Sequence, residues 1–317
     1  MTKKLLIYNS GGGIGDSIQL FPLILSLKNL FEKSEIYYLG AHENHYSGKL
    51  KEYNIQVKTL NLGLKYFGFR WWHLFATKRN FLKLKLDKFN LIVDCQSKFR
   101  NTIILKQIPS KTFYSSTFNN MFCSGLENSA AKFKYDLKAI DYDIKNIEKK
   151  YFDESLRLLP DKNYIGFSLT QGNVYRKKEW PLNNVIEISN KLIKLNKIPV
   201  FFIEKRNTVL KNKINEFVPK ALFPEHASEL ASPALVTCLA KRLEFAISID
   251  NGVMHMLSLA KVPMITLFGP TDSDKFAPKY KKSIILDSKK IYKTENVSDI
   301  TVEDVLTAAK LHLNFSS

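Results

Sequence analysis

Polar residues that can do chemistry follow an apolar run in residues 245–256 (FAISIDNGVMHM). The run predicts a buried strand that ends at Asp250. A helix is then predicted to begin at Asn251 and Gly252, with His255 one turn further on. In open α/β sheets, ligands bind where strand carboxyl ends meet helix amino ends, and helix N–H groups favour phosphate there. The segment therefore predicts a phosphate site, with a buried structural role as the alternative for His255.

A glycine-rich turn follows the first apolar run, in GGGIGDSIQLFP at residues 11–22. Gly13 and Gly15 let the backbone turn tightly and approach a ligand, and Asp16 stands at the start of the next helix. The spacing fits neither the dinucleotide fingerprint G-x-G-x-x-G nor the Walker A sequence G-K-[ST]. Asp16 is therefore either a functional carboxylate or a helix cap. Two such turns in one chain predict two facing domains with a phosphorylated ligand between them.

A basic loop precedes another helix start, in TQGNVYRKKEWP at residues 170–181. Pro181 suits the first turn of a helix. Either Arg176, as a planar fork, or Lys178, as a compact charge, can grip a diphosphate. A solvated basic loop is the alternative interpretation.

The acidic and thiol groups give no metal or disulfide pattern. Asp272 and Asp274 form a D-x-D pair without a histidine or third acid at suitable spacing, which favours a polar turn, and Asp141 and Asp143 are similar. We therefore expect no metal site and no metal cofactor. The cysteines are widely spaced and indicate reduced thiols in a cytosolic protein. They are Cys95, Cys123 and Cys238.

The chain is strongly basic, with 48 Lys and Arg against 30 acidic residues and a formal charge of +18. This charge indicates either anionic partners or a codon composition that favours lysine. No nucleic-acid-binding module is recognised, so no nucleic acid partner is expected. Residues 66–80 (YFGFRWWHLFATKRN) mix aromatic and basic side chains. They either contact anionic lipid head groups or a sugar-phosphate acceptor, or pack their rings on the first domain.

Strands and helices alternate twice along the chain, which predicts an α/β fold with two doubly wound parallel sheets. A length of 317 residues suits two domains, and the charged residues 137–161 are predicted to connect them. The predicted domains are residues 1–155 and 156–317. Strands are predicted at residues 4–9, 35–40, 55–62, 90–96, 164–170, 199–204, 245–250, 263–269 and 283–288. Helices are predicted at residues 14–31, 101–108, 181–196, 207–217, 232–242, 252–261 and 301–315, and residues 80–89 suit helix or strand. The last helix is predicted to have Thr301 as its N-cap and Glu303 or Asp304 in its first turn.

Together these motifs resemble glycosyltransferase family 9, the heptosyltransferase-like enzymes of lipopolysaccharide assembly. The resemblance covers both halves of the chain in order, through GIGDSIQLFP, LIVDCQSKFRN, KEWP, an acid after the next strand at Glu204, and DNGVMH followed by LFGPTD. It implies a GT-B fold of two facing Rossmann-like domains. Residues 1–155 would form the acceptor-side domain, and residues 156–317 would bind the nucleotide sugar.

The resemblance also implies roles for single residues. Asp16 would be the general base of an inverting, metal-independent transfer, Lys178 would contact the donor phosphates, and Glu204 would contact the nucleoside or ribose. The sugar-diphosphate site would be lined by Asp250, Asn251, Gly252 and His255. Two positions depart from the family pattern, since Asn251 replaces the more usual Thr or Ser and a glycine-rich lead into Glu204 is missing.

The implied reaction moves a sugar, heptose by family default and often from ADP-heptose, to a lipopolysaccharide core or related glycan. The implied partners are a nucleotide-sugar donor and a lipid-linked or oligosaccharide acceptor. The short apolar start does not resemble a signal peptide, and no run of residues is long enough to span a membrane. We expect a cytoplasmic protein with peripheral contact to the anionic inner face of the membrane. The alternatives are a GT-B epimerase, or a hydrolytic or non-catalytic nucleotide-sugar-binding protein.

Overall fold

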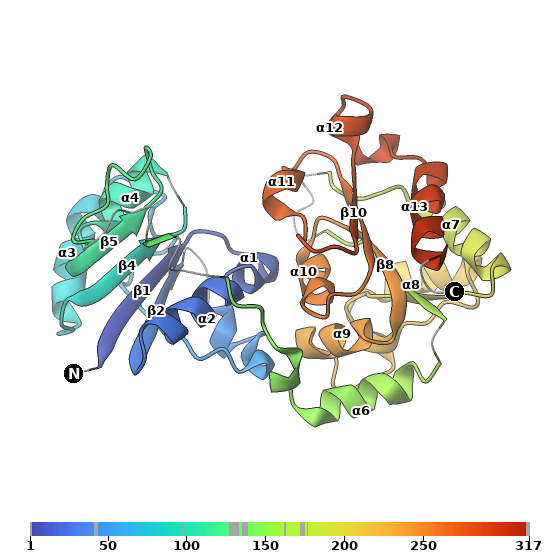
Figure 1. The fold of residues 1–317 in the computed structure, drawn as a ribbon, viewed down its shortest axis with the longest axis horizontal. Coiled ribbons are helices and arrows are strands. Elements are labelled where there is room, and N and C mark those ends of the chain that lie inside the picture. Colours follow the sequence, from blue (N-terminus) through green and yellow to red (C-terminus); the bar gives the residue numbers. More distant parts are fainter. Residues whose placement is uncertain are drawn as a thin grey trace. The chain divides into compact units, whose positions relative to one another are not determined.

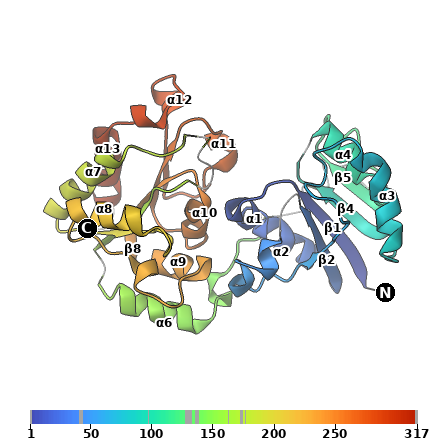
Figure 2. The ribbon, with the colours of Figure 1, turned by 180° about the vertical axis from the view of Figure 1, so that it is seen from behind.

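The chain forms two compact units, Met1–Tyr142 and Asp143–Ser317, which Figures 1 and 2 show from opposite sides. Each unit is a parallel sheet with helices on both faces. The computed structural model describes residues 2–40, 44–96, 98–126, 133–134, 139–161, 163–171, 175 and 177–314.

The division between the units lies inside the connection predicted at residues 137–161. It precedes the boundary expected between residues 155 and 156, because α6 (Lys149–Leu158) packs against α9 (Pro233–Ala240) of the second unit. Tyr151 and Ser155 are the buried residues of α6. The charged face of this helix, which suggested a linker, is therefore the solvent side of an amphipathic helix.

The first unit has a five-stranded sheet in the order β3-β2-β1-β4-β5. Every paired strand is parallel. The central β1 and β4 are short apolar runs buried on both faces, as a parallel sheet covered by helices requires. The strands are β1 (Lys3–Asn9), β2 (Ser34–Gly40), β3 (Lys58–Thr59), β4 (Phe89–Asp94) and β5 (Ser110–Ser115).

Helices cover the two faces of this sheet. Leu6 and Tyr8 of β1 share a core with Phe81 of α3 and Ile104 of α4, so α3 and α4 cover one face side by side (Figures 1 and 2). On the other side, α2 contacts β2 and buries Phe21, Ile24 and Leu27. The helices are α1 (Ile14–Ile18), α2 (Phe21–Leu30), α3 (His73–Lys83) and α4 (Phe99–Leu105), with 3-10 turns η1 (His45–Ser47) and η2 (Lys51–Tyr53).

The second unit repeats the plan with a parallel sheet in the order β10-β9-β8-β6-β7. The strands are β6 (Tyr164–Ser168), β7 (Ile198–Phe201), β8 (Leu243–Ile249), β9 (Met264–Phe268) and β10 (Ser283–Asp287). α7, α8 and α13 bury their apolar sides in one large core with these strands, while α6, α9 and α10 pack together on the other face (Figure 1).

The remaining helices of the second unit follow from local sequence signals. Ser232 caps α9 through a hydrogen bond from the N–H of Leu235, and proline stands at the first position of that helix. The helices are α7 (Leu182–Lys194), α8 (Thr208–Phe217), α10 (Gly252–Leu259), α11 (Ser273–Phe276), α12 (Ser288–Ile291) and α13 (Val302–Asn314). The 3-10 turns are η3 (Ile144–Asn146), η5 (Pro224–His226) and η6 (Val297–Asp299).

The predicted α/β class with two doubly wound parallel sheets is confirmed, and most predicted elements are present. The predicted N-cap at Thr301 is also confirmed, because its hydroxyl accepts from the N–H of Asp304 while the Asp304 carboxylate accepts from the N–H of Thr301. This reciprocal arrangement is a capping box. Its two hydrogen bonds start α13 where the sequence predicted it.

Several boundaries differ from the sequence prediction. The single helix expected at residues 14–31 is two helices, α1 and α2. Pro22 lies in the first turn of α2, where proline is favoured. The strand expected at residues 55–62 contains only the two paired residues of β3, at the sheet edge. β5 was not predicted, since it is a half-exposed edge strand without a clear apolar run. The ambiguous residues 80–89 contribute the end of α3 and the start of β4.

Gly68 shows how tightly the carboxyl edge of the first sheet is packed. Its φ is +85°, and a Cβ placed there would lie 2.3 Å from the hydroxyl of Tyr8 and 3.0 Å from Cγ of Asn101. The Tyr8 hydroxyl donates to the carbonyl of Phe67 and accepts from Nδ2 of Asn101. No side chain fits without breaking this buried network.

We expect Gly68→Ala to lower the free energy of unfolding by about 2–4 kcal/mol, from backbone strain together with overpacking. Gly63→Ala is the matched control, because Gly63 has φ +66° and no atom near the added Cβ, so only strain of about 1 kcal/mol applies. Urea unfolding followed by circular dichroism measures both. Equal losses for the two variants would contradict the packing argument.

Candidate functional site

The second sheet reverses its direction of winding between its two central strands, β6 and β8. β6 leads through α7 to β7, whereas β8 leads through α10 to β9, and these two helices lie on opposite faces (Figure 1). Such a switch point, at the carboxyl ends of the strands, is the general ligand site of open α/β sheets. The residues predicted from DNGVMH and KEWP follow these two strands.

Lys178 and Asp250 form an ion pair at this switch point. The Lys178 ammonium lies 2.5 Å from Oδ2 of Asp250 and 3.3 Å from its backbone carbonyl. The side chains are only 14% and 8% exposed. The backbone N–H of Lys178 also donates to Oε1 of Gln171, which closes the loop after β6. A lysine has three N–H donors, so it can hold a carboxylate and a phosphate oxygen together.

Asn251 joins the ends of the same two strands. Its Oδ1 accepts from the N–H of Met254 and caps α10, while its Nδ2 donates to the hydroxyl of Ser168 and to the carbonyl of Thr170. A threonine or serine here could cap the helix but has no second donor for the β6 loop. Asparagine at position 251, in place of the Thr or Ser that the family pattern favours, thus adds a hydrogen bond between the loop that carries Thr170 and the loop that carries Asp250.

Gly252 and His255 lie in the first turns of α10. Gly252 is the first residue of the helix, where backbone N–H groups point out of the helix end and no Cβ restricts approach. His255 is 8% exposed, and its backbone carbonyl accepts from the hydroxyl of Ser258. The structure therefore brings Lys178, Asp250 and the amino end of α10 together, as the resemblance implied.

Asp16 lies at the matching position of the first unit, directly after β1. It is the third residue of α1, and its Oδ2 accepts from the N–H of Gly13 at 3.1 Å. Asp16 is therefore a helix cap, as one alternative predicted. In the described residues no hydrogen bond reaches its other oxygen, Oδ1. Burial, followed by the negative charge of Asp16, raises the pKa of Tyr38 far above its ordinary value.

The glycines around Asp16 fit closely to its side chain. A Cβ on Gly11 would lie 2.7 Å from Cγ of Asp16, so only glycine leaves room for the carboxylate there. His45 was not singled out from the sequence, yet it is buried behind this turn with Nε2 3.1 Å from the carbonyl oxygen of Gly12. A carbonyl only accepts, so His45 donates this bond. No local sequence pattern marks His45, because it contacts Gly12 across 33 residues of the chain.

The glycine turn is also fixed to the neighbouring strand. Oδ1 of Asn9 accepts hydrogen bonds from the N–H of Gly11 and from Nε2 of Gln96, and Oε1 of Gln96 accepts from the hydroxyl of Ser10. Gln96 follows β4, the strand beside β1. The switch point of the first sheet therefore has a side-chain amide bridge, like that made by Asn251 in the second.

Glu204 lies apart from the groups around Lys178. It is exposed after β7, where it pairs with Arg206. Close by, in η5, stands Glu225, which the sequence did not reveal. Burial, followed by the charge of Glu204, raises the pKa of Glu225 to about 7. Two carboxyl groups thus lie close enough to interact electrostatically beyond the end of β7, and the pKa of one of them is raised.

Other predicted residues have structural roles or are not described. Asp272 caps α11 by accepting from the N–H of Asp274 and of Lys275, and Asp274 pairs with Lys290. Arg176 lies outside the described residues. Within the described ranges, no group of three His, Cys, Asp or Glu side chains is placed to hold a metal ion. In the same ranges, no helix is both long and apolar enough to cross a membrane.

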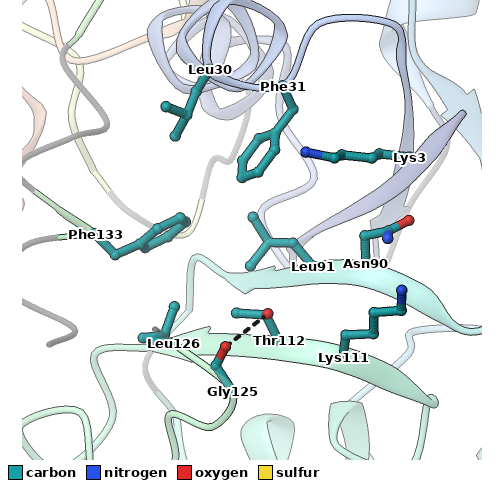
Figure 3. Close-up of a pocket in the computed structure, with 10 residues that line it drawn as sticks. All are labelled: Lys3, Leu30, Phe31, Asn90, Leu91, Lys111, Thr112, Gly125, Leu126 and Phe133. Carbon is teal, nitrogen blue, oxygen red and sulfur yellow. Dashed lines mark hydrogen bonds between the residues drawn. The ribbon is translucent and has the colours of Figure 1, made fainter. Parts of the chain in front are cut away.

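A pocket of about 390 Å³ lies in the first unit (Figure 3). Its polar lining includes Lys3 at the start of β1 and Lys111 near the start of β5, with Leu91 between them. These residues mark the amino edge of the sheet, whereas Asp16 follows the carboxyl end of β1. The pocket is therefore not part of the candidate site.

The two doubly wound sheets, each with polar groups at its switch point, define the GT-B fold class. Three solved structures share it over almost their whole length. The first is a glycosyl transferase family 9 protein from Veillonella parvula DSM 2008, with 17% sequence identity and a TM-score of 0.69 over 99% of this chain and 98% of that chain. The second is E. coli ADP-heptose lps heptosyltransferase II, with 14% identity and a TM-score of 0.66 over 100% of both chains. The third is E. coli heptosyltransferase WaaC with ADP, with 14% identity and a TM-score of 0.63 over 98% of this chain and 99% of that chain.

A family model described as glycosyltransferase family 9 (heptosyltransferase) matches residues 119–306, which is more than half of the chain. The protein belongs to glycosyltransferase family 9. A comparison with curated proteins gives no match.

The raised pKa of Glu225 gives a test of the site's electrostatics. The pKa of Glu225 in the folded protein lies above the ordinary value of 4.5, so its contribution to stability is complete below about pH 4.5 and is lost as the pH rises through 7. We expect the free energy of unfolding of wild type to fall by about 1–3 kcal/mol more than that of Glu225→Gln across this pH range. Urea unfolding at several pH values measures the difference. Glu229→Gln, at an exposed carboxylate, is the control; parallel curves for wild type and Glu225→Gln would refute the assignment.

Proposed function

We propose that this protein is an inverting glycosyltransferase that moves a sugar, by family default heptose, from a nucleotide-diphospho-sugar to a lipopolysaccharide core or related glycan. The observation that carries the proposal is the Lys178–Asp250 pair beside the amino end of α10. This combination of a cation and free helix N–H groups suits a diphosphate. Family membership and the ADP bound in the WaaC structure support ADP-heptose as the expected donor.

In this proposal the second unit binds the donor. Lys178 and the N–H groups at Asn251 and Gly252 hold the diphosphate, and Asp250 orients the lysine. As the bond from the anomeric carbon to the phosphate oxygen breaks, negative charge grows on the leaving nucleoside diphosphate. Groups fixed in advance at that charge stabilise the transition state more than the ground state. These groups make a metal ion unnecessary, so the transfer is proposed to be metal-independent.

The remaining donor contacts are assigned by position. His255, one turn into α10, lines the sugar-diphosphate site together with Asp250. Glu204 contacts the nucleoside or ribose, since hydroxyl groups of a ribose donate to carboxylates. Its neighbour Glu225 is a second acceptor at the same strand end, and when protonated it becomes a donor as well.

Asp16 is proposed as the general base, with Gly13 and Gly15 shaping the acceptor loop. The acceptor hydroxyl oxygen forms a bond to the anomeric carbon while its proton passes to the Asp16 carboxylate. The hydrogen bond from Gly13 occupies Oδ2 and orients the group, which leaves Oδ1 for the proton. A positioned base of this kind contributes ~10²–10⁴-fold to the rate. The proposed acceptor is lipid-linked or an oligosaccharide, which suits a cytoplasmic protein in peripheral contact with the inner membrane face.

Asp16→Asn tests the base. The amide oxygen still accepts from Gly13, so the helix start is preserved, but the group no longer takes a proton. We expect kcat to fall by ~10²–10⁴-fold with donor affinity nearly unchanged. Steady-state assays with the preferred nucleotide sugar measure both quantities. Asp87→Asn, at the exposed partner of Lys4 before β4, is the control; wild-type turnover by Asp16→Asn would reject the role.

Lys178→Ala tests the donor site. A panel of nucleoside diphosphates and their sugars should raise the Tm of wild type, because binding stabilises the folded state by mass action. The variant also leaves Asp250 without its ion-pair partner, which lowers the Tm by itself. The quantity compared between wild type and variant is therefore the rise in Tm caused by the ligand. We expect affinity to fall at least about tenfold.

Lys197→Ala is the matched control for this substitution. Lys197 forms a similarly covered pair with Glu244, at 2.7 Å, but at the amino ends of β7 and β8. The rise in Tm that nucleotides cause in Lys197→Ala should equal the rise that they cause in wild type. No thermal shift with any nucleotide in wild type, or equal loss in both variants, would overturn the proposed donor site.

A further inference from the structure

A row of aromatic side chains lies on the surface of the first unit, with Trp71, Phe99 and Phe118 exposed and Phe122 partly buried against the core. The ring of Trp71 lies 6.4 Å from that of Phe99, and Phe99 lies 5.6 Å from Phe118 and 5.8 Å from Phe122. Trp71 is 52% exposed and Phe118 is 59% exposed. These residues come from the loop before α3, the start of α4 and the turn after β5. We call Trp71, Phe99, Phe118 and Phe122 the aromatic ridge.

The solvent face of α3 extends the apolar surface. Phe75 and Leu82 are 81% and 63% exposed and lie seven residues apart, which places them on one face of the helix. The opposite face buries Ala76 and Phe81 in the unit. Surface helices normally carry polar residues on the solvent side, so this exposed stripe needs an explanation. Only part of residues 66–80 therefore packs its rings on the first unit.

The stretch of chain that carries these rings is positively charged. Residues 60–126 contain eleven Lys or Arg, two Asp and no Glu. Neither aspartate offsets the charge near the ridge, because Asp87 pairs with Lys4 and Asp94 is buried, accepting from Thr102 and Ser115. Lys78 and Arg79 are exposed on α3 itself. The net charge of this stretch is therefore a local feature and not only a property of the whole chain.

The ridge is rigidly attached at the carboxyl edge of the sheet. The carbonyl of Phe67 accepts from Tyr8, next to the end of β1, and the carbonyl of Gly68 accepts from Nε of Arg100 in α4. α3 and α4 lie side by side in both views (Figures 1 and 2). Asp16 follows β1 at this same edge. A surface that contacts the ridge would thus lie near the proposed acceptor loop.

We propose that the aromatic ridge, with Phe75 and the basic residues of α3, is the docking surface for an anionic lipid bilayer. Tryptophan and phenylalanine side chains enter the interfacial region of membranes, and lysine and arginine bind anionic head groups. A surface both aromatic and cationic matches an anionic bilayer better than it matches a second copy of this basic chain, which the like charges would repel. The inference rests on the proposed function in one respect, since a lipid-linked acceptor would give the protein a reason to bind the membrane.

Vesicle co-sedimentation of the full chain tests the surface. Wild type should bind phosphatidylcholine vesicles that contain phosphatidylglycerol, bind pure phosphatidylcholine vesicles weakly, and dissociate as salt is raised. We expect Trp71→Ser with Phe75→Ser to weaken binding by about tenfold or more. Lys78→Gln with Arg79→Gln should weaken binding to anionic vesicles by about tenfold and leave the weak neutral binding unchanged.

Matched controls come from α8 of the second unit and the turn that follows it. Val209→Ser and Phe217→Ser remove apolar side chains of similar exposure, 79% and 50%. Lys213→Gln with Lys220→Gln removes two exposed charges. Both controls should bind vesicles within about twofold of wild type. Phe75→Ser alone is the fallback if the double variant does not fold, since Phe75 has the most exposed ring of the set.

Three outcomes would overturn the docking surface. These are equal binding to neutral and anionic vesicles, equal losses in ridge and α8 variants, and a ridge substitution that changes the oligomeric state in light scattering without any vesicle binding. The nucleotide-induced Tm shift, measured on the same proteins without lipid, separates this from the proposed function. An intact shift with no vesicle binding refutes the docking surface alone, and vesicle binding with no nucleotide shift refutes the donor site alone.

Discussion

The ion pair between Lys178 and Asp250 is the constraint on which the candidate donor site depends. Both side chains are largely removed from water, and removal of one partner from such a pair costs about 3–5 kcal/mol because a charge stays buried without compensation. The pair therefore fixes the loop after β6 to the end of β8. Through Asp250 it also fixes the position at which α10 begins. A cation held in place next to free helix N–H groups needs no reorganisation to receive a diphosphate.

Side-chain amides form hydrogen bonds with the polar groups at the strand ends of both switch points. Where two central strands end and their helices leave on opposite faces, backbone groups lose their sheet partners and need others. Asn251 supplies these partners between β8 and β6, and Asn9 with Gln96 supplies them between β1 and β4. The result is a rigid edge on each sheet. Rigid edges are what allow loops to carry functional groups in defined positions.

Asp16 illustrates why a structural and a catalytic role are compatible. Its hydrogen bond with Gly13 starts α1, and the glycine at position 11 leaves space for the carboxylate. The same bond restricts the side chain to one orientation, which is a requirement for a proton acceptor. The two interpretations open at the level of sequence are therefore not exclusive. The hydrogen bond that caps the helix also orients the carboxylate, as the proposed role of Asp16 requires.

The sequence by itself determined the local features of this protein. Apolar runs predicted the central strands, and Thr301 with Asp304 predicted the start of α13, because these depend on neighbouring residues along the chain. The glycines and polar residues after β1, β6 and β8 likewise marked the strand ends that carry the site. These features are local, so a single chain reveals them.

Only the tertiary structure decided which distant groups meet. Lys178 and Asp250 are 72 residues apart, and their pairing follows from β6 lying beside β8, an order that periodicity does not encode. The same is true of Glu225 beside Glu204 and of Trp71 beside Phe99. The edge strand β5 also escaped prediction, because its pairing with β4 compensates for a weak apolar pattern. Long-range contacts depend on strand order and helix packing, and these are properties of the whole fold.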